Sequence, residues 1–204
     1  MAFDIATEKN TFNSTVAIGE LGTQFFWFNV ESSKFEYALP LVSGGEYGGD
    51  TETFEAPEMD SDTVAKVSGR TTLSDLTFTT NYTAARYERW SQITDNTKPQ
   101  VYCEVFSDGS AVVSNGTSGM PTIQGGDVRQ IEVTVAPQGV VWLENVLKIA
   151  DDDKIEQINA MLKAQGAKTD VISKGEGSDV ALPFDYNTLP NSRIGVASKE
   201  AENQ

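Results

Sequence analysis

Short segments in which apolar and polar residues alternate constrain the fold of this chain more than any other feature. The clearest contains Ile131, Val133 and Val135, each followed or preceded by a polar residue. Leu76 and Phe78 alternate with threonines in the same way. Successive side chains of a strand point to opposite faces, so this pattern predicts strands with one buried and one solvated face. A mainly β protein is expected.

Dense aromatic or apolar runs predict further strands, at residues 24–30, 35–42, 64–69, 100–106, 110–114 and 140–143. Asp108-Gly109 between two such runs predicts a hairpin. Pro137-Gln138-Gly139 predicts a turn that separates the strand around Val133 from the strand at 140–143. Strands spaced in this way around one short helix predict a β-sandwich or a partly closed barrel.

Two segments have the period of a helix. Tyr87, Trp90 and Ile93 recur every three residues, which predicts a short helix over 84–93 that packs on the sheet through this apolar face. Apolar residues on one face also predict a helix over 154–165, preceded by three aspartates that suit the positive end of a helix.

The chain divides into three expected parts. Residues 1–22 form a polar N-terminal arm, residues 23–145 a β domain, and residues 146–204 the second helix followed by an extended arm. The arm from 167 onwards has few large apolar side chains, so we expect it to become ordered only against a neighbouring molecule.

Residues 43–63 are an exposed loop or hairpin excursion of the β domain. From Glu46 to Asp62 the segment holds seven acidic residues and no Lys or Arg. Excursions of more than about 12–15 residues in compact domains are usually functional or disordered. The four glycines within Gly44–Gly49 are not followed by the Gly-Lys-Ser/Thr of a phosphate loop, so we interpret them as a flexible hairpin tip.

The sequence contains little that could perform catalysis. There is no histidine, which removes the usual general base, the Ser-His-Asp arrangement and the commonest metal ligand. The single Cys103 lies in an apolar run and predicts a buried strand thiol in a reducing compartment. We predict no catalytic residue, metal site or cofactor. A pair of carboxylates acting as a glycosidase stays open, because such a pair is defined by its separation in space.

Charge and hydropathy limit the partners. A net charge of −15 argues against a nucleic-acid clamp, which needs clustered Lys and Arg. The sequence has no apolar run of about 20 residues, and its start lacks the basic-then-apolar order of a secretory signal, so we expect a soluble, unexported protein without membrane contact.

Three tryptophans leave an alternative function open. Trp27, Trp90 and Trp142 suit a non-catalytic carbohydrate- or receptor-binding β-sandwich, in which exposed indoles stack on sugars. Each tryptophan lies in a segment typical of buried core, however, and core packing is the preferred interpretation.

Two longer segments resemble a known family. Residues 70–93 (RTTLSDLTFTTNYTAARYERWSQI) and 123–142 (IQGGDVRQIEVTVAPQGVVW) are similar to the major tail tube proteins of long-tailed bacteriophages. The first resembles the strand, Asn-Tyr dipeptide and short helix of that family, and the second its closing hairpin. The resemblance spans roughly residues 20–145.

The resemblance implies a structural virion protein that forms hexameric rings, which stack into a hollow tail tube for DNA ejection. Its implied partners are copies of itself, the tape measure protein, the tail terminator and tail-tip proteins, with DNA passing unbound through an acidic lumen. The resemblance also implies that the protein assembles in the host cytoplasm and is located in the virion tail. Another virion component, such as a head decoration or tail-completion protein, is the alternative within this class.

The resemblance also assigns candidate contact residues. The candidates for contact between subunits or for lining the lumen are Glu46, Tyr47, Asp50, Glu52, Phe54, Glu55, Glu58, Asp60 and Asp62. The C-terminal arm lies beyond the resemblance, and it either packs on the outside of the tube or reaches a neighbouring subunit. We prefer the second, for which its own apolar residues Phe184, Tyr186 and Leu189 are the candidate anchors.

Overall fold

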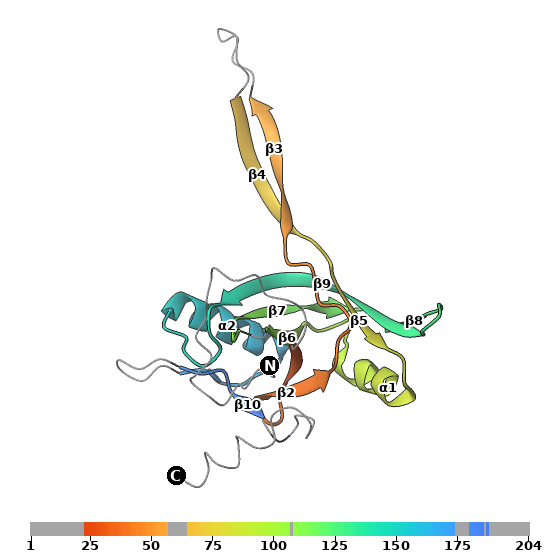
Figure 1. Ribbon diagram of the computed structural model, residues 1–204. Helices are drawn as coiled ribbons and strands as arrows, with labels where there is room; N and C mark the ends of the chain where they lie inside the picture. The colour runs from red at the N-terminus through yellow and green to blue at the C-terminus, as the bar shows by residue number, and fades with distance from the viewer. Residues whose placement is uncertain (1–22, 57–64, 107, 174–179, 186, 188–204) are drawn as a thin grey trace.

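The computed structural model describes residues 23–56, 65–106, 108–173, 180–185 and 187, with the backbone alone described at 51–56 and 65–71. The elements in chain order are β1 (Gln24–Asn29), β2 (Lys34–Leu39), β3 (Gly49–Ala56), β4 (Ala65–Leu73), β5 (Leu76–Asn81), α1 (Ala84–Ile93), β6 (Gln100–Val105), β7 (Ala111–Ser118), β8 (Thr122–Gln124), β9 (Gln130–Leu143), α2 (Asp152–Gln165) and β10 (Phe184–Asp185). Figure 1 shows a β body from which β3 and β4 project.

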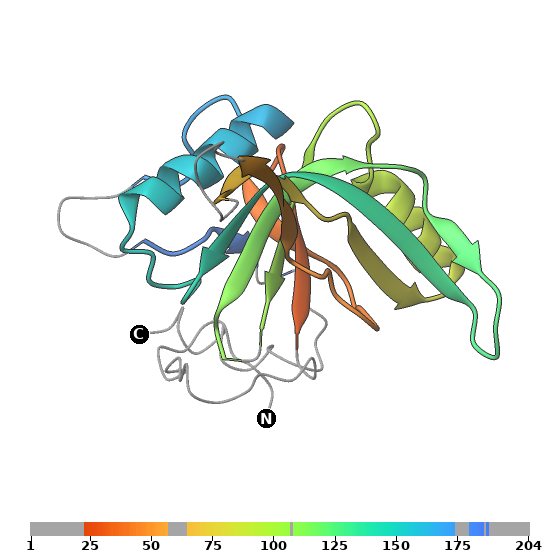
Figure 2. The same cartoon turned by 90° about the horizontal axis from the view of Figure 1, so that it is seen from above.

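Eight strands form one curled sheet in the order β10-β2-β1-β6-β7-β9-β5, with β8 also paired to β9. All pairs are antiparallel except β10 with β2. The chain leaving β2 returns to the far edge of the sheet, where Ser43 forms a bridge with Thr79 of β5. This bridge curls the sheet into a partly closed barrel (Figure 2), which confirms the predicted fold class.

The central strands β6 and β7 are buried on both faces, whereas β5 and β9 alternate buried and exposed residues. Along β6 all six residues are buried, and Val101, Cys103 and Val105 face one core while Tyr102 faces the other. The first core is covered by α2, through residues that include Ile158, and by the C-terminal segment. The second core is covered by α1, and the two helices lie against different parts of the sheet in Figure 2. Alternation in β6 is therefore invisible in the sequence, because neither face meets water.

The expected turn at Pro137-Gln138-Gly139 is wrong, because β9 runs through it as one strand of 14 residues. Asn115 of β7 pairs with Gly139 and Gly116 pairs with Pro137, so Gln138 is one extra residue on β9. This is a β-bulge, a position at which a strand tolerates proline. Proline and glycine here mark an irregular pairing rather than a change of direction.

The bulge changes which core the odd-numbered residues of β9 reach. Ile131, Val133 and Val135 lie in the second core, whereas Val141 and Leu143 lie in the first. One inserted residue reverses the facing of every residue beyond it, because side chains alternate with a period of two. A single strand can thus contribute to both cores.

Both predicted helices form, with local caps. Thr83 accepts a hydrogen bond from the amide of Arg86 at 3.2 Å and caps α1. Asp151 accepts from the amides of Asp153 and Lys154 and caps α2, which ends at Gly166 with a φ of 132°. A side-chain oxygen at the N-cap satisfies amides that have no partner within the helix, and glycine adopts a positive φ without strain.

The three tryptophans have different environments. Trp90 is fully buried and Trp27 is half-buried, as expected for core positions. Trp142 is exposed over 44% of its surface, so the expectation of a buried side chain is wrong there. The bulge explains the difference. Beyond Gln138 the odd-numbered residues Val141 and Leu143 face the first core, so Trp142 between them points to the opposite face of the sheet.

The buried Cys103 predicts base sensitivity. Burial raises the pKa of its thiol, whereas the thiol of the unfolded chain ionises at about pH 8.5. The native state therefore holds the proton longer, and stability falls as pH rises above about 9. We expect Cys103→Ala to reduce the slope of unfolding free energy against pH by up to about 1.4 kcal/mol per pH unit between pH 9 and 10, measured by urea unfolding.

The control for this change is Val113→Ala, which truncates the residue paired with Cys103 on β7. It lowers stability through lost packing but keeps the wild-type slope. Equal slopes in wild type and Cys103→Ala would contradict the assignment.

Candidate assembly interface

β3 and β4 form a hairpin that stands outside the main sheet. In the described part of the chain these two strands pair only with each other, from Gly49 opposite Leu73 to Ala56 opposite Ala65. The hairpin projects away from the β body in Figure 1. A two-stranded hairpin is marginally stable in water, and each of its outer edges presents unpaired backbone groups. The element is therefore suited to binding another surface.

The predicted contact loop and this hairpin overlap. Glu46 and Asp50 are exposed near the root of the hairpin, and Tyr47 is half-buried there. Glu52, Phe54 and Glu55 lie in β3, where the backbone alone is described. Glu58, Asp60 and Asp62 lie outside the described residues. Their assignment to subunit contacts or to a lumen stays a prediction.

A buried carboxylate holds the root of the hairpin. Glu104 of β6 is only 4% exposed, and its Oε2 accepts a hydrogen bond from the Tyr47 hydroxyl at 2.7 Å. The amide of Gly45 also donates to this oxygen, at 3.4 Å. Burial, and then the charge and hydrogen bond of Glu104, raise the pKa of Tyr47, so the phenol stays protonated and able to donate. We call these three residues the Glu104 clasp.

Gly44 and Gly45 have a structural role at this root. A Cβ at Gly44 would overlap the Glu104 carboxylate, and one at Gly45 would crowd the Phe78 ring. Strand pairing in the hairpin begins only at Gly49. The interpretation of these glycines as a flexible tip is therefore wrong: they pass closely over the sheet because only glycine fits above Glu104.

The clasp is supported by pairing on both sides of the hairpin root. The amide of Val42 donates to the carbonyl of Thr79 at 2.8 Å, and the amide of Thr79 donates to Ser43 at 3.2 Å. The amide of Ser74 donates to Gly48 at 3.1 Å. Both strands thus leave the body from fixed positions, which sets where the hairpin starts.

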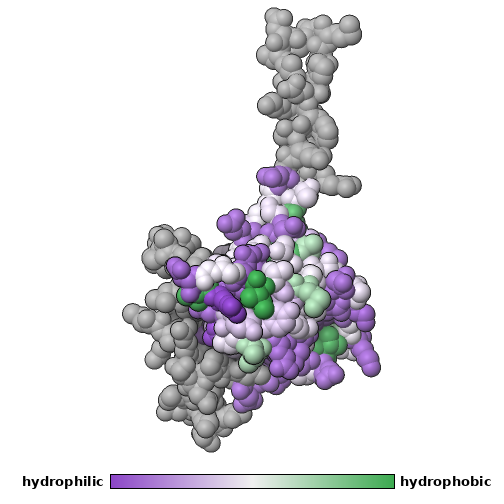
Figure 3. Space-filling model, turned by 90° about the vertical axis from the view of Figure 1, so that its right-hand side faces the viewer, coloured by the Kyte–Doolittle hydropathy of each residue, from purple (hydrophilic) through white to green (hydrophobic). Residues whose placement is uncertain are grey.

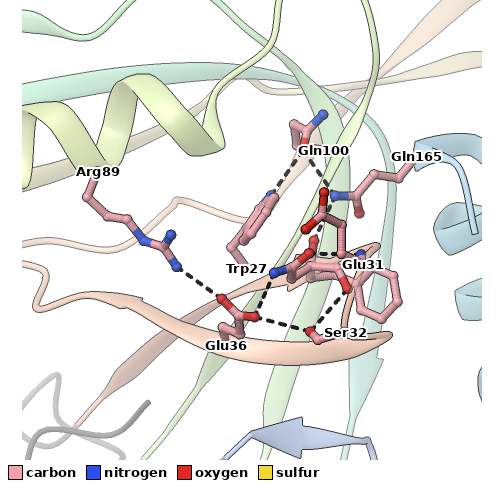
Figure 4. A network of polar contacts seen from close by, with 9 residues as sticks. Trp27, Glu31, Ser32, Glu36, Arg89, Gln100 and Gln165 are labelled. Carbon is pink, nitrogen blue, oxygen red and sulfur yellow. Dashed lines mark hydrogen bonds and ion pairs between the residues drawn. The ribbon is translucent and has the colours of Figure 1, made fainter.

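A polar network joins the two helices across the sheet (Figure 4). The guanidinium of Arg89 in α1 lies 3.5 Å from Glu36 and 5.5 Å from the centre of the Trp27 ring. The Trp27 indole donates to Gln100 at 3.0 Å, and Gln165 of α2 donates to the same oxygen at 3.0 Å. These contacts fix both helices to the β1–β2 end of the sheet.

The candidate packing residues of the first helix lie on its sheet side. Trp90 and Ile93 are fully buried in the second core, and the Trp90 ring lies 5.6 Å from that of Phe25. Tyr87 is partly buried and packs against this core. The helix thus closes the second core.

Phe184 packs inside its own chain. Its ring lies 4.6 Å from that of Phe26 and 5.7 Å from that of Phe35, and β10 pairs with β2. The expectation that this residue anchors the arm on a neighbour is therefore wrong, because the side chain fills the first core. Tyr186 and Leu189 lie outside the described residues.

The described residues offer little chemistry of other kinds. They include no group of three or more His, Cys, Asp or Glu side chains that could hold a metal ion. Cys103 is fully buried. Neither described helix is long and apolar enough to cross a membrane.

Sequence reasoning missed the Glu104 clasp. A glutamate within the apolar run VYCEVF has no partner visible nearby, since Tyr47 lies 57 positions away. A signal was nonetheless present: a charged residue in the middle of a fully buried strand requires a hydrogen-bonding partner.

Comparisons with known proteins identify the type of fold. A sheath/tube terminator of an extracellular contractile injection system (PVC, extended state) is similar over 64% of this chain and 99% of its own, with a TM-score of 0.50 and 11% identity. The chain therefore has a tail-tube-type β fold.

Two further solved structures are similar. One comes from the tail of an empty GTA particle refined with C6 symmetry (TM-score 0.46, 13% identity, 62% of this chain and 98% of that one). The other is the tube-terminating cap of the anti-feeding prophage (TM-score 0.44, 11% identity, 62% and 91%). No protein-family model and no curated protein sequence matches this chain.

Loss of the clasp should lower stability. We expect Tyr47→Phe to cost about 1.5–3 kcal/mol of unfolding free energy, because it removes a buried hydrogen bond to a carboxylate. Urea unfolding measures the change. Tyr82→Phe is the control, because Tyr82 is exposed, and it should change stability by less than about 0.5 kcal/mol. Equal stability of the two variants would rule out the clasp.

Truncation of Phe184 tests its place in the core. We expect Phe184→Ala to destabilise the isolated chain by about 3–5 kcal/mol, since it leaves a cavity between Phe26 and Phe35. Thermal or urea unfolding of monomeric protein provides the measurement. Lys168→Ala, at an exposed position, serves as the control. A monomer of wild-type stability would show that Phe184 acts elsewhere.

Proposed function

We propose that this chain is a non-enzymatic structural subunit of a phage-like tail, and that it forms rings which stack into a tube. The observation that carries the proposal is the β3–β4 hairpin, which extends from a tail-tube-type body and pairs with no other strand in the described residues. By extension, its neighbours are copies of itself and other tail components, and its place is the virion tail.

The physics of the hairpin supports assembly. A hairpin of two strands has one sheet layer and no core of its own, so water competes for its backbone groups at both edges. Contact with an adjacent subunit or ring removes these groups from water and adds packing. Its fixed root at the Glu104 clasp lowers the entropy lost on binding, because the element already leaves the body from a fixed position.

Charge supports a conduit. The chain carries 30 acidic and 15 basic residues, and Glu46 and Asp50 at the hairpin root are exposed. In a closed ring, a lumen of like charge repels phosphates, which lets DNA pass without binding. Six subunits per ring, and contacts with tape measure, terminator and tail-tip proteins, are the finer parts of this proposal.

A terminator at the tube end is the second candidate. The comparison that favours it is the sheath/tube terminator, whose whole length is matched by this chain. A terminator forms one ring on the tube and stops further stacking, whereas a tube subunit polymerises. Electron microscopy of the purified protein separates them: tubes of uniform width indicate a tube subunit, and single rings indicate a terminator.

Removal of the hairpin tests the proposal. Gly49 and Leu73 are direct partners, so residues 50–72 can be replaced by an Asn-Gly turn that closes the two strands. We expect this variant to keep the wild-type unfolding midpoint, since no hairpin residue whose side chain is described belongs to either core, and to lose tubes or stacked rings in negative-stain images.

The control for the deletion exchanges Glu46 and Asp50 for Gln and Asn, which keeps the hairpin and removes charge at its root. This variant should assemble as wild type does. Assembly of the hairpin-deleted protein into normal tubes would contradict the proposed role of β3 and β4.

A further inference from the structure

Several exposed apolar residues lie along the end of the sheet that holds β8 and the start of β9. Six large apolar residues are strongly exposed in the described chain, and four belong to this end of the sheet: Tyr82 (36%), Met120 (78%), Ile123 (50%) and Val128 (61%). Tyr82 is tied to this hairpin, because its amide donates to the carbonyl of Arg129 at 2.8 Å. We call these four residues the hairpin patch. Figure 3 views this side of the molecule and shows apolar groups set among polar ones.

A second apolar site lies at the other end of the same strand. Trp142 is 44% exposed near the end of β9, and its ring lies 5.8 Å from that of Phe106. We call these two side chains the tryptophan patch. At about 3.3 Å per residue, the 14 positions between Val128 and Trp142 amount to about 45 Å along the chain, so the two patches lie at opposite ends of the strand. Figure 1 shows β9 running across the whole body.

Exposed charged residues flank both patches. Val128 lies between two exposed charged residues, Asp127 and Arg129. The hairpin patch is therefore flanked by one negative and one positive charge. Exposed Glu144 follows Trp142 by two positions, directly after the end of β9. An arginine at one end and a carboxylate at the other are complementary between two copies, not within one.

We propose that adjacent subunits of a ring meet end to end, with the hairpin patch of one copy on the tryptophan patch of the next. This inference rests on the proposed function and identifies one of its interfaces. The two patches differ and lie at opposite ends of β9, so one copy cannot satisfy both. Head-to-tail contact buries both patches on every subunit, and such contacts close into rings. Exposed aromatic and apolar patches of this kind mark interfaces between proteins.

Two variants block one patch each. Ile123→Lys places a charge in the hairpin patch and Trp142→Lys places one in the tryptophan patch. Both positions are exposed, so each variant should keep the wild-type unfolding midpoint. Alone, each should need at least about ten times more protein to assemble than wild type does, by analytical ultracentrifugation. Ala160→Lys, at an exposed position of α2 outside both patches and the hairpin, should assemble normally.

A mixture of the two variants gives the decisive result. The intact hairpin patch of Trp142→Lys can meet the intact tryptophan patch of Ile123→Lys, but no further contact is possible. We therefore expect the mixture to form dimers of one copy of each variant, with no rings. A hairpin patch that binds a second hairpin patch would leave Trp142→Lys able to assemble and yield no mixed dimer, which overturns the inference.

The remaining outcomes separate this inference from the proposed function. If wild type assembles and both variants assemble equally well, the end-to-end contact is wrong while the proposed function stands. If the variants self-assemble but lose binding to another tail component, the patches face that component and the inference is overturned. Wild-type protein that stays monomeric at high concentration would overturn the proposed function, and this interface with it.

Discussion

Burial of both faces of the central strands of the sheet is the constraint on which the rest of the structure depends. All six residues of β6 are buried, so cover is needed on each side and the curl must be closed. α2 and the segment around Phe184 supply one cover and α1 supplies the other, while the bridge between Ser43 and Thr79 closes the curl. Edges or faces left open would bind other chains indiscriminately. The stable body thereby limits where the molecule can offer a surface to a partner.

Local pattern was a good guide wherever a residue's environment was set by its near neighbours. The alternation of Ile131, Val133 and Val135 and the three-residue period of α1 each reflect one buried face, and both elements form as expected. The pattern failed where the environment was set by distant residues. The bulge at Gln138 depends on pairing with β7, and it reverses the facing that decides the exposure of Trp142. Glu104 depends on Tyr47, which arrives over the sheet from 57 positions away.

The C-terminal segment shows why low apolar content misled. Few large side chains follow α2, yet Leu182 and Phe184 both reach the first core, because the amide of Leu182 donates to the Val146 carbonyl and β10 places Phe184 along the edge of β2. A short segment needs little hydrophobic surface of its own when the sheet beside it supplies the rest. The hairpin of β3 and β4 is the opposite case: its two strands pair along their length apart from one irregularity, but no sheet lies beside them in the described residues.

The extra residue in β9 also limits how such a chain can change during evolution. Residues before Gln138 serve one core and residues after it serve the other, so deletion of this residue would turn Val141 and Leu143 away from α2. Recombination between related genes within β9 would give a folded protein only if the product keeps one extra residue between the part that faces the second core and the part that faces the first. The β3–β4 hairpin is not tied to this phase, because neither core contains a hairpin residue whose side chain is described. The number of residues in β9 around Gln138 should therefore stay fixed.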